Sequence, residues 1–232
     1  MEKLKFKDGF YDSVPLIIGF IPIAMTFGLL ARSNAFSLFE TTAFSMFVFA
    51  GSSQFIAINL LALNTDISQI IIATLLINFR HFLMGLSIKN KFDKSLKPFI
   101  PLIAFGITDE TFSILSFKKE NLTKEYTLSL ELFAYLSWVG GTFSGYVIGN
   151  FLPQIVQKSM GIALYALFIS LLIPEVKKEY KYLYLAIISG VLNTVFIKIF
   201  LIPQGWSIIL SIIITSLLGV QILKVRREAV YE

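Results

Sequence analysis

Long apolar stretches separated by short polar connectors dominate this chain of 232 residues. A helix needs about 20 mostly apolar residues to cross a ~30 Å hydrocarbon core. Eight stretches approach this length and leave no room for a soluble domain. They predict an all-α integral membrane protein with about seven to eight hydrophobic segments, folded as one polytopic domain over residues 1–232. The approximate segments are residues 13–31, 37–63, 66–86, 98–117, 126–149, 155–173, 182–202 and 206–223.

Prolines and glycines in the first and fifth segments predict how these helices bend and pack. Pro22, together with Pro15, predicts that the first segment is kinked or broken, because proline cannot donate the helical hydrogen bond. Gly141 and Gly145, with Gly149, form a GxxxGxxxG stripe on the fifth segment. Helices approach each other closely along such a stripe, so it predicts a packing face for a helix of this chain or of another chain.

The fourth segment is interrupted near residues 106–110, which predicts a discontinuous or re-entrant helix. Gly106 ends a short apolar piece, and glycine readily takes the left-handed conformation that follows a helix. Thr108 is then a good N-cap for a second piece. Asp109 and Glu110 fall in the first turn of that piece, where acids complement the helix dipole. An ordinary aqueous loop at residues 108–110 is the alternative.

The second segment repeats this pattern near residues 51–54, where Gly51 precedes Ser52, Ser53 and Gln54. Broken helices leave backbone groups unpaired. Membrane proteins tolerate such groups at depth where they line a cavity or bind a ligand. Both predicted breaks are therefore candidate parts of a polar site.

The third segment carries an asparagine, an arginine and the single histidine of the chain near its end. Asn78 and His81 share one helical face with Thr74 and Gly85, since successive spacings are four, three and four residues. Arg80 lies about 100° round the helix, so it addresses a different neighbour or extends to the membrane interface. A charged residue inside a bilayer costs about 2.5–3.5 kcal/mol on insertion scales, so these residues predict a polar interior. A buried, hydrogen-bonded structural histidine is the alternative for His81.

The acidic residues suggest proton coupling rather than metal binding. Asp109 and Glu110 are adjacent, and burial raises the affinity of a carboxylate for a proton, so one of them is a candidate for proton coupling. Two adjacent carboxylates without a third ligand are a weak metal site, so we predict no metal and no cofactor. Glu131 lies near the start of the fifth segment, where an interfacial position is expected.

The composition supports the membrane assignment. The chain is 56% hydrophobic and 15% charged, whereas an average soluble domain is about 25% charged. Its mean hydropathy is +0.75. The net charge of +5 is concentrated in short connectors, which indicates positive-inside loops at a lipid bilayer and no nucleic-acid partner. The absence of cysteine excludes disulfides, thiolate metal sites and cysteine catalysis.

The basic connectors leave two membrane topologies open. If every segment crosses, the amino terminus is cytoplasmic, but the basic connector at residues 89–97 lies outside, against the positive-inside tendency. If residues 98–117 are re-entrant, this connector is cytoplasmic. The amino terminus is then outside, unless another early segment also fails to cross.

Several motifs in residues 10–175 occur together in one known family. They are PIA at 22–24, FG at 27–28, FVFAGSSQF at 47–55, NFRHFLMGLS at 78–87 and AFGITDETF at 104–112, with Tyr135, Trp138, Gly141, Thr142 and Gly145. This combination resembles the large subunit of the AzlC-type, or YgaZ-like, branched-chain amino-acid exporters. The resemblance implies proton-driven export of leucine, isoleucine and valine, with methionine as a further candidate, across the cytoplasmic membrane. It also implies a small membrane partner subunit of the AzlD type.

A site for such an amino acid needs a partner for the carboxylate, a partner for the ammonium group and an apolar pocket. The candidates for the carboxylate are the half-helix start near residues 52–54, or Arg80. Asp109 or Glu110 is the candidate for the ammonium group or for the coupling proton. The alkyl chain has three candidate contacts from the third segment: Phe79, Phe82 and Met84.

Two other classes of function remain open. The same broken helices could line a channel-like passive pore for small solutes. A membrane-embedded enzyme is the second alternative, although no nucleophile motif or metal set accompanies His81, and we expect no enzymatic activity.

Overall fold

The computed structural model of the chain describes residues 4–118, 120–149, 151, 153, 155, 169, 172–174, 176–177 and 179–228. The regular secondary structure of these residues is helical, which confirms the predicted all-α fold. Most of the predicted segment at 155–173 lies outside the described residues. Two compact units are present: a larger unit of Met1–Phe55 and Asn78–Tyr165, and a smaller unit of Ile56–Ile77 and Ala166–Glu232.

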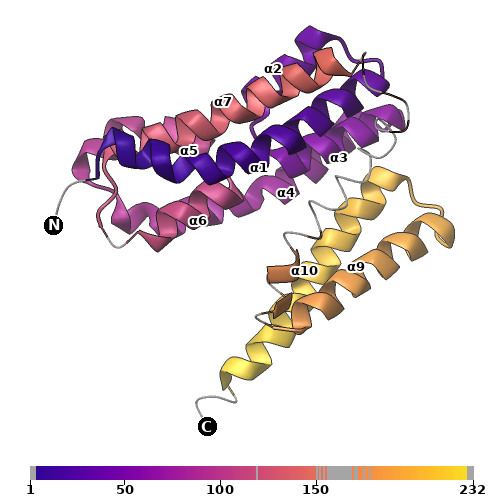
Figure 1. Ribbon diagram of the computed structural model, residues 1–232. Helices are drawn as coiled ribbons and strands as arrows, with labels where there is room; N and C mark the ends of the chain where they lie inside the picture. Colours follow the sequence, from indigo (N-terminus) through magenta and orange to yellow (C-terminus); the bar gives the residue numbers. More distant parts are fainter. Residues whose placement is uncertain are drawn as a thin grey trace. The chain divides into compact units, whose positions relative to one another are not determined.

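The helices follow one another in an order that matches the predicted segments (Figure 1). In chain order they are α1 (Phe6–Ser33), α2 (Leu38–Val48), α3 (Gly51–Ala62), α4 (Ile67–Ile88), the 3-10 helices η1 (Lys89–Lys91) and η2 (Lys94–Phe99), α5 (Ile100–Gly106), α6 (Asp109–Phe117), α7 (Lys124–Ile148), α9 (Lys181–Lys198) and α10 (Gln204–Glu228).

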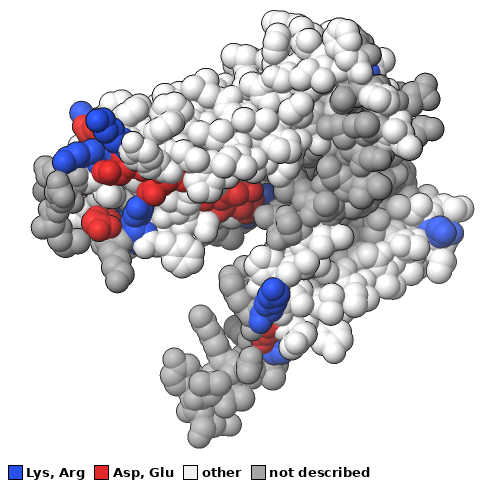
Figure 2. All heavy atoms as spheres, in the orientation of Figure 1, with Lys and Arg blue, Asp and Glu red and all other residues white. Residues whose placement is uncertain are grey.

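Four stretches in the described part of the chain are long and apolar enough to cross a membrane: Phe6–Ser33, Ile67–Lys91, Lys181–Lys198 and Gln204–Gln221. The count of seven to eight segments stays a prediction. Charged side chains gather toward one end of the larger unit, while most of the other visible described surface carries none (Figure 2). This distribution fits a body whose flanks face lipid.

Helices α1 and α7 lie side by side and form the centre of the larger unit (Figure 1). The helix α1 is continuous through Pro15 and Pro22, so the first segment is not broken, and the predicted kink stays a prediction. Glycines of α7 make the close approach of α1 and α7 possible. A Cβ on Gly141 would lie 2.8 Å from the Ala24 Cβ, and a Cβ on Gly145 would meet the Met25 backbone. The GxxxG stripe therefore packs against a helix of this chain.

Short helices at the sides of this pair complete the larger unit. α2 begins with a capping box in which Ser37 Oγ accepts from the Glu40 N–H, and Ser37 N–H donates to the Glu40 carboxylate. The Ser37 hydroxyl also donates to the Glu40 carboxylate, at 2.7 Å. This bond first, and then the bond from the Ser37 N–H, lower the pKa of Glu40 below its ordinary value. Near η2, α5, α6 and α7, buried apolar side chains form a cluster: Ile88, Leu96, Ile103, Ile107, Leu115, Leu122, Tyr126 and Leu130.

The smaller unit contains the antiparallel pair α9 and α10 and the adjoining parts of α3 and α4. Ser207 Oγ of α10 donates to Asn193 Oδ1 of α9 at 2.7 Å. Gly205 lies against Gln69 and Thr65, where a Cβ would meet both side chains. None of the residues of α9 is buried within the structure, which is typical of a helix that faces lipid or a partner.

Candidate functional site

The second half of the break between α5 and α6, where α6 begins, agrees with the sequence prediction. Thr108 is the N-cap of α6, and its Oγ1 accepts from the Thr111 N–H at 3.2 Å. The Thr108 N–H donates to Thr111 Oγ1 at 2.7 Å, so the two threonines cap each other. Asp109 and Glu110 occupy the first turn of α6. Thr108 and Thr111 are buried, and Asp109 and Glu110 are helical, so residues 108–110 do not form an irregular loop.

Gly106 ends α5, but not for the predicted reason. None of the described glycines has a positive φ, so Gly106 does not take the left-handed conformation. Instead, a Cβ on Gly106 would lie 2.5 Å from the carboxyl carbon of Glu131 on α7. Glycine is required here because a side chain from another helix fills the space.

The break between α2 and α3 lies slightly earlier than predicted. Phe49 has a φ of 31° and a left-handed conformation, Ala50 follows, and Gly51 is already the first residue of α3. Ser52, Ser53 and Gln54 therefore form the first turn of a helix and not the interruption itself. Gly51 lies against the Trp138 ring, where a Cβ would be 2.6 Å from the nearest ring carbon.

Arg80 of α4 connects the two half-helix starts. Its Nη2 lies 2.8 Å from Asp109 Oδ2 at the start of α6 and donates to Ser52 Oγ at the start of α3, at 2.7 Å. Arg80 therefore addresses neighbouring helices, as the first of the two alternatives predicts. The two charged side chains keep 34% and 25% of their surface exposed, so the ion pair is accessible from outside the protein.

The polar face of α4 reaches the same place. Asn78 Nδ2 donates to Ser53 Oγ at 3.1 Å, beside the contact between Arg80 and Ser52. Two buried polar atoms of this group, Asn78 Oδ1 and Arg80 Nε, have no hydrogen-bond partner among the described residues. Buried polar atoms are normally paired, so these two are the unsatisfied polar groups of this cluster. His81 is near enough to interact electrostatically with Arg80 and Asp109.

Gln54 belongs to a different polar network. Its Nε2 donates to Ser45 Oγ at 3.0 Å, and its Oε1 accepts from Trp138 Nε1 at 2.9 Å. Ser45 in turn hydrogen-bonds Thr142 at 2.8 Å. Gln54 is fully buried and both ends of its amide are hydrogen-bonded, so this network joins α2, α3 and α7.

We expect Trp138→Phe to lower the free energy of unfolding by about 1–3 kcal/mol, because the buried Gln54 Oε1 loses its donor. Trp206→Phe is the matched control, since Trp206 is the other tryptophan and is 41% exposed. Thermal unfolding of both variants in detergent, followed by circular dichroism, makes the measurement. Equal stability of Trp138→Phe and wild type would show that the hydrogen bond contributes nothing.

Aromatic side chains also join the two breaks. The Phe49 ring lies 6.0 Å from the Phe105 ring and 5.3 Å from the Tyr135 ring, between ring centres. The predicted apolar contacts from α4 fit less well, because Phe79 and Phe82 are both more than half exposed. Apolar surface close to the breaks therefore comes from Phe49, Phe105 and Tyr135.

Glu131 is the residue whose importance the sequence analysis missed. It is 5% exposed, and neither carboxyl oxygen has a hydrogen-bond partner among the described residues. Its expected depth at the membrane interface stays a prediction. A signal was present in the sequence. Glu131 lies seven residues before Trp138 and 14 before Gly145, and a spacing of seven returns to the same face of a helix. The glycine stripe marks that face as buried.

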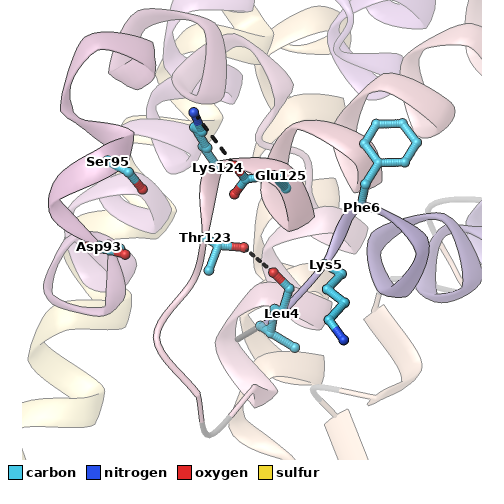
Figure 3. Close-up of a pocket in the computed structure, with 8 residues that line it drawn as sticks. All are labelled: Leu4, Lys5, Phe6, Asp93, Ser95, Thr123, Lys124 and Glu125. Carbon is cyan, nitrogen blue, oxygen red and sulfur yellow. Dashed lines mark hydrogen bonds and ion pairs between the residues drawn. The ribbon is translucent and has the colours of Figure 1, made fainter. Parts of the chain in front are cut away.

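A pocket of about 340 Å³ lies elsewhere in the larger unit (Figure 3). It is formed by the start of α1, η2 and the start of α7, and Thr123 Oγ1 donates to the Leu4 carbonyl beside it at 2.6 Å. None of the residues predicted for the site lines this pocket. Its lining is Leu4, Lys5, Phe6, Asp93, Ser95, Thr123, Lys124 and Glu125.

Comparison with known proteins assigns the chain to a family. The AzlC protein family model matches residues 15–152. The inner membrane protein YgaZ of Escherichia coli (strain K12) is 32% identical over 195 residues, which cover 81% of this chain and 80% of YgaZ. The chain belongs to the AzlC family. The branched-chain amino acid transport protein AzlC of Bacillus subtilis (strain 168) is 29% identical over 180 residues, or 76% of this chain and 70% of that protein.

Another relative of this AzlC-family protein is an uncharacterized membrane protein of Archaeoglobus fulgidus, 37% identical over 175 residues, which cover 74% of this chain and 76% of the relative. No solved structure matches the chain. The region matched by the AzlC model contains both helix breaks, the ion pair between Arg80 and Asp109, and Glu131. The AzlC match therefore covers the whole candidate site.

Proposed function

We propose that this AzlC-family protein is a secondary transporter that exports branched-chain amino acids across the cytoplasmic membrane. Leucine, isoleucine and valine are the proposed substrates, with methionine as a further candidate, and the proton gradient is the proposed driving force. The name of the Bacillus subtilis relative supports the substrate class. The observation that carries the proposal is the Arg80 guanidinium, held between two half-helix starts, with no partner for its Nε in the part of the chain that the structure describes.

The geometry provides partners for both charged ends of an amino acid. A guanidinium presents donors in a planar fork that matches a carboxylate, so the Nε edge of Arg80 is the proposed carboxylate site. Asp109 or Glu110 is the proposed partner of the ammonium group. The Phe49, Phe105 and Tyr135 rings supply apolar surface for the alkyl chain.

The broken helices support a transport function over a structural one. Transporters place their substrate sites at discontinuous helices, because the half-helix ends present unpaired backbone groups to the ligand. Here Ser52 lies at the start of α3 and Asp109 at the start of α6, and the Arg80 side chain contacts both. Relative movement of α3 and α6 would break or remake the contacts of Arg80, which provides a simple way to open and close the site.

We also propose a small membrane partner subunit of the AzlD type. In the smaller unit no residue of α9 is buried, and in the larger unit Phe79 and Phe82 of α4 are exposed, so each unit has apolar surface that a further membrane protein could cover. A transporter rather than an enzyme is proposed, since the AzlC family is a family of transport proteins.

Efflux of labelled leucine tests the function. Cells preloaded with leucine should lose it several-fold faster when they produce this chain together with the small partner than when they carry an empty vector. Producing each protein alone shows whether the partner is required. Equal efflux with and without both proteins would contradict the proposal. Collapse of the proton gradient by a protonophore separates a transporter from a passive pore, because a pore does not move leucine against its concentration gradient.

A further inference from the structure

Glu131 is a buried acid in the larger unit with no described partner. It lies on α7, 5% of its surface is exposed, and both carboxyl oxygens lack a hydrogen-bond partner in the described part of the chain. No ion pair to it is formed by the described residues. An ionised carboxylate in this position would lack both water and a counter-charge, which is strongly unfavourable.

The carboxyl group of Glu131 packs directly on the break between α5 and α6. A Cβ on Gly106 would lie 2.5 Å from both the carboxyl carbon and Oε2. The carboxyl therefore fills the space that a side chain at position 106 would take. An amino acid or a hydrated metal ion does not fit between these groups, whereas a proton needs no additional space.

The end of α5 favours the protonated form of Glu131. The last turn of a helix leaves carbonyl oxygens without intrahelical donors, and Gly106 is the last residue of α5. A neutral carboxylic acid has a hydroxyl that can donate to such a carbonyl, but an ionised carboxylate has only acceptors. Thr111 Oγ1 already donates to the Gly106 carbonyl at 3.0 Å, so a protonated Glu131 would need another carbonyl of this turn as its acceptor.

The charged groups of the helices around α7 are mostly occupied. Asp12 of α1 binds Lys118 and Tyr126, and Arg32 of α1 donates to the Tyr146 carbonyl. α5 has no titratable residue. The remaining described groups on neighbouring elements are Lys7 and Asp8 of α1, Glu40 of α2, Lys97 of η2, and Asp109 and Glu110 of α6. Of these, Asp8 accepts from the Lys5 N–H, Glu40 binds Ser37 and Asp109 pairs with Arg80.

We infer that Glu131 is a proton-binding residue that couples protonation to the opening of the break between α5 and α6. In the packed state its carboxyl is neutral and lies against Gly106. Loss of the proton to water requires the carboxyl to separate from Gly106, which moves the end of α5. Asp109 follows Gly106 by three residues, so this movement reaches the ion pair with Arg80. This inference rests on the proposed transport function and identifies the residue that carries its proton.

Glu131→Gln tests the inference, because glutamine has the shape of the protonated acid and cannot release a proton. Purified full chain with its small partner is placed in liposomes, and two leucine fluxes are measured. Leucine counterflow without a pH gradient should remain within about twofold of wild type. Accumulation driven by a pH gradient should fall by about tenfold or more, within the range of ordinary coupling between two sites.

Glu125→Gln is the matched control, since Glu125 is an exposed glutamate in the first turn of the same helix. It should leave both fluxes unchanged. Wild-type accumulation by Glu131→Gln would overturn the inference. Loss of counterflow together with accumulation, in a variant that folds, would also overturn it, because Glu131 would then be structural or would bind leucine.

Infrared spectroscopy gives a readout that does not depend on transport. The wild-type protein should show the carbonyl stretch of a protonated carboxylic acid at neutral pH, and Glu131→Gln should lack it. If Glu131→Gln does not fold, Glu131→Asp should retain the band at a shifted frequency. Presence of this band in a wild-type protein that does not move leucine would refute the proposed function but retain Glu131 as a proton site. Absence of the band from folded wild type would overturn the inference.

Discussion

Replacing Asp109 by Asn should abolish leucine export. Asparagine has the same shape and can still accept a hydrogen bond from Arg80, so the substitution removes the charge and preserves the geometry. The variant loses the counter-charge of Arg80 and the proposed partner of the ammonium group together. Efflux of labelled leucine from preloaded cells, with production of the variant confirmed by immunoblotting, makes the measurement.

A stability measurement separates this role from a structural one. Exposed ion pairs contribute about 0–1 kcal/mol to folding, and loss of one partner of a buried pair costs about 3–5 kcal/mol. The Arg80 and Asp109 side chains are 34% and 25% exposed, so loss of the pair should reduce stability only moderately. Asp66→Asn is the matched control for leucine efflux and should export leucine as wild type does, because Asp66 is an exposed aspartate immediately before α4. Normal leucine efflux from Asp109→Asn would contradict the proposed role.

Gly145→Ala should cause the largest loss of stability among conservative substitutions in the larger unit. The added Cβ would meet the backbone of Met25 on α1, and a backbone cannot move aside as a flexible side chain can. Overpacking of a core costs about 1–3 kcal/mol of stability. We expect the upper end of that range for Gly145→Ala, because the added Cβ would force α1 and α7 apart. Thermal unfolding in detergent, together with the yield of monodisperse protein, makes the measurement.

Gly140→Ala provides a control on the same helix. Gly140 has no atom within 4 Å of its ideal Cβ position, so alanine is accommodated there. Alanine in the middle of a helix is favoured over glycine by about 0.5–1 kcal/mol, and Gly140→Ala should therefore be as stable as wild type or slightly more stable. Equal effects at positions 140 and 145 would show that glycine is not required for the close approach of α1 and α7.

The sequence predicted the helical elements because their causes are local. Hydropathy over about 20 residues located the segments that became α4, α7, α9 and α10. The Thr108 cap was predicted correctly because it depends on residues three positions apart. The break before α3 was predicted within two residues, but Phe49, which takes the left-handed conformation, carries no sequence feature that marks it.

The sequence alone determined a helical membrane protein with two broken helices, a polar face on α4 and the motifs of the AzlC family. Only the tertiary structure decided which side chains meet. Arg80 and Asp109 are separated by 29 positions, and Gln54 and Trp138 by 84. These pairs depend on how each helix is rotated against its neighbours, and that rotation is set by packing between distant segments. For the same reason the burial of Glu131 against Gly106 became visible only when α5 and α7 were placed together.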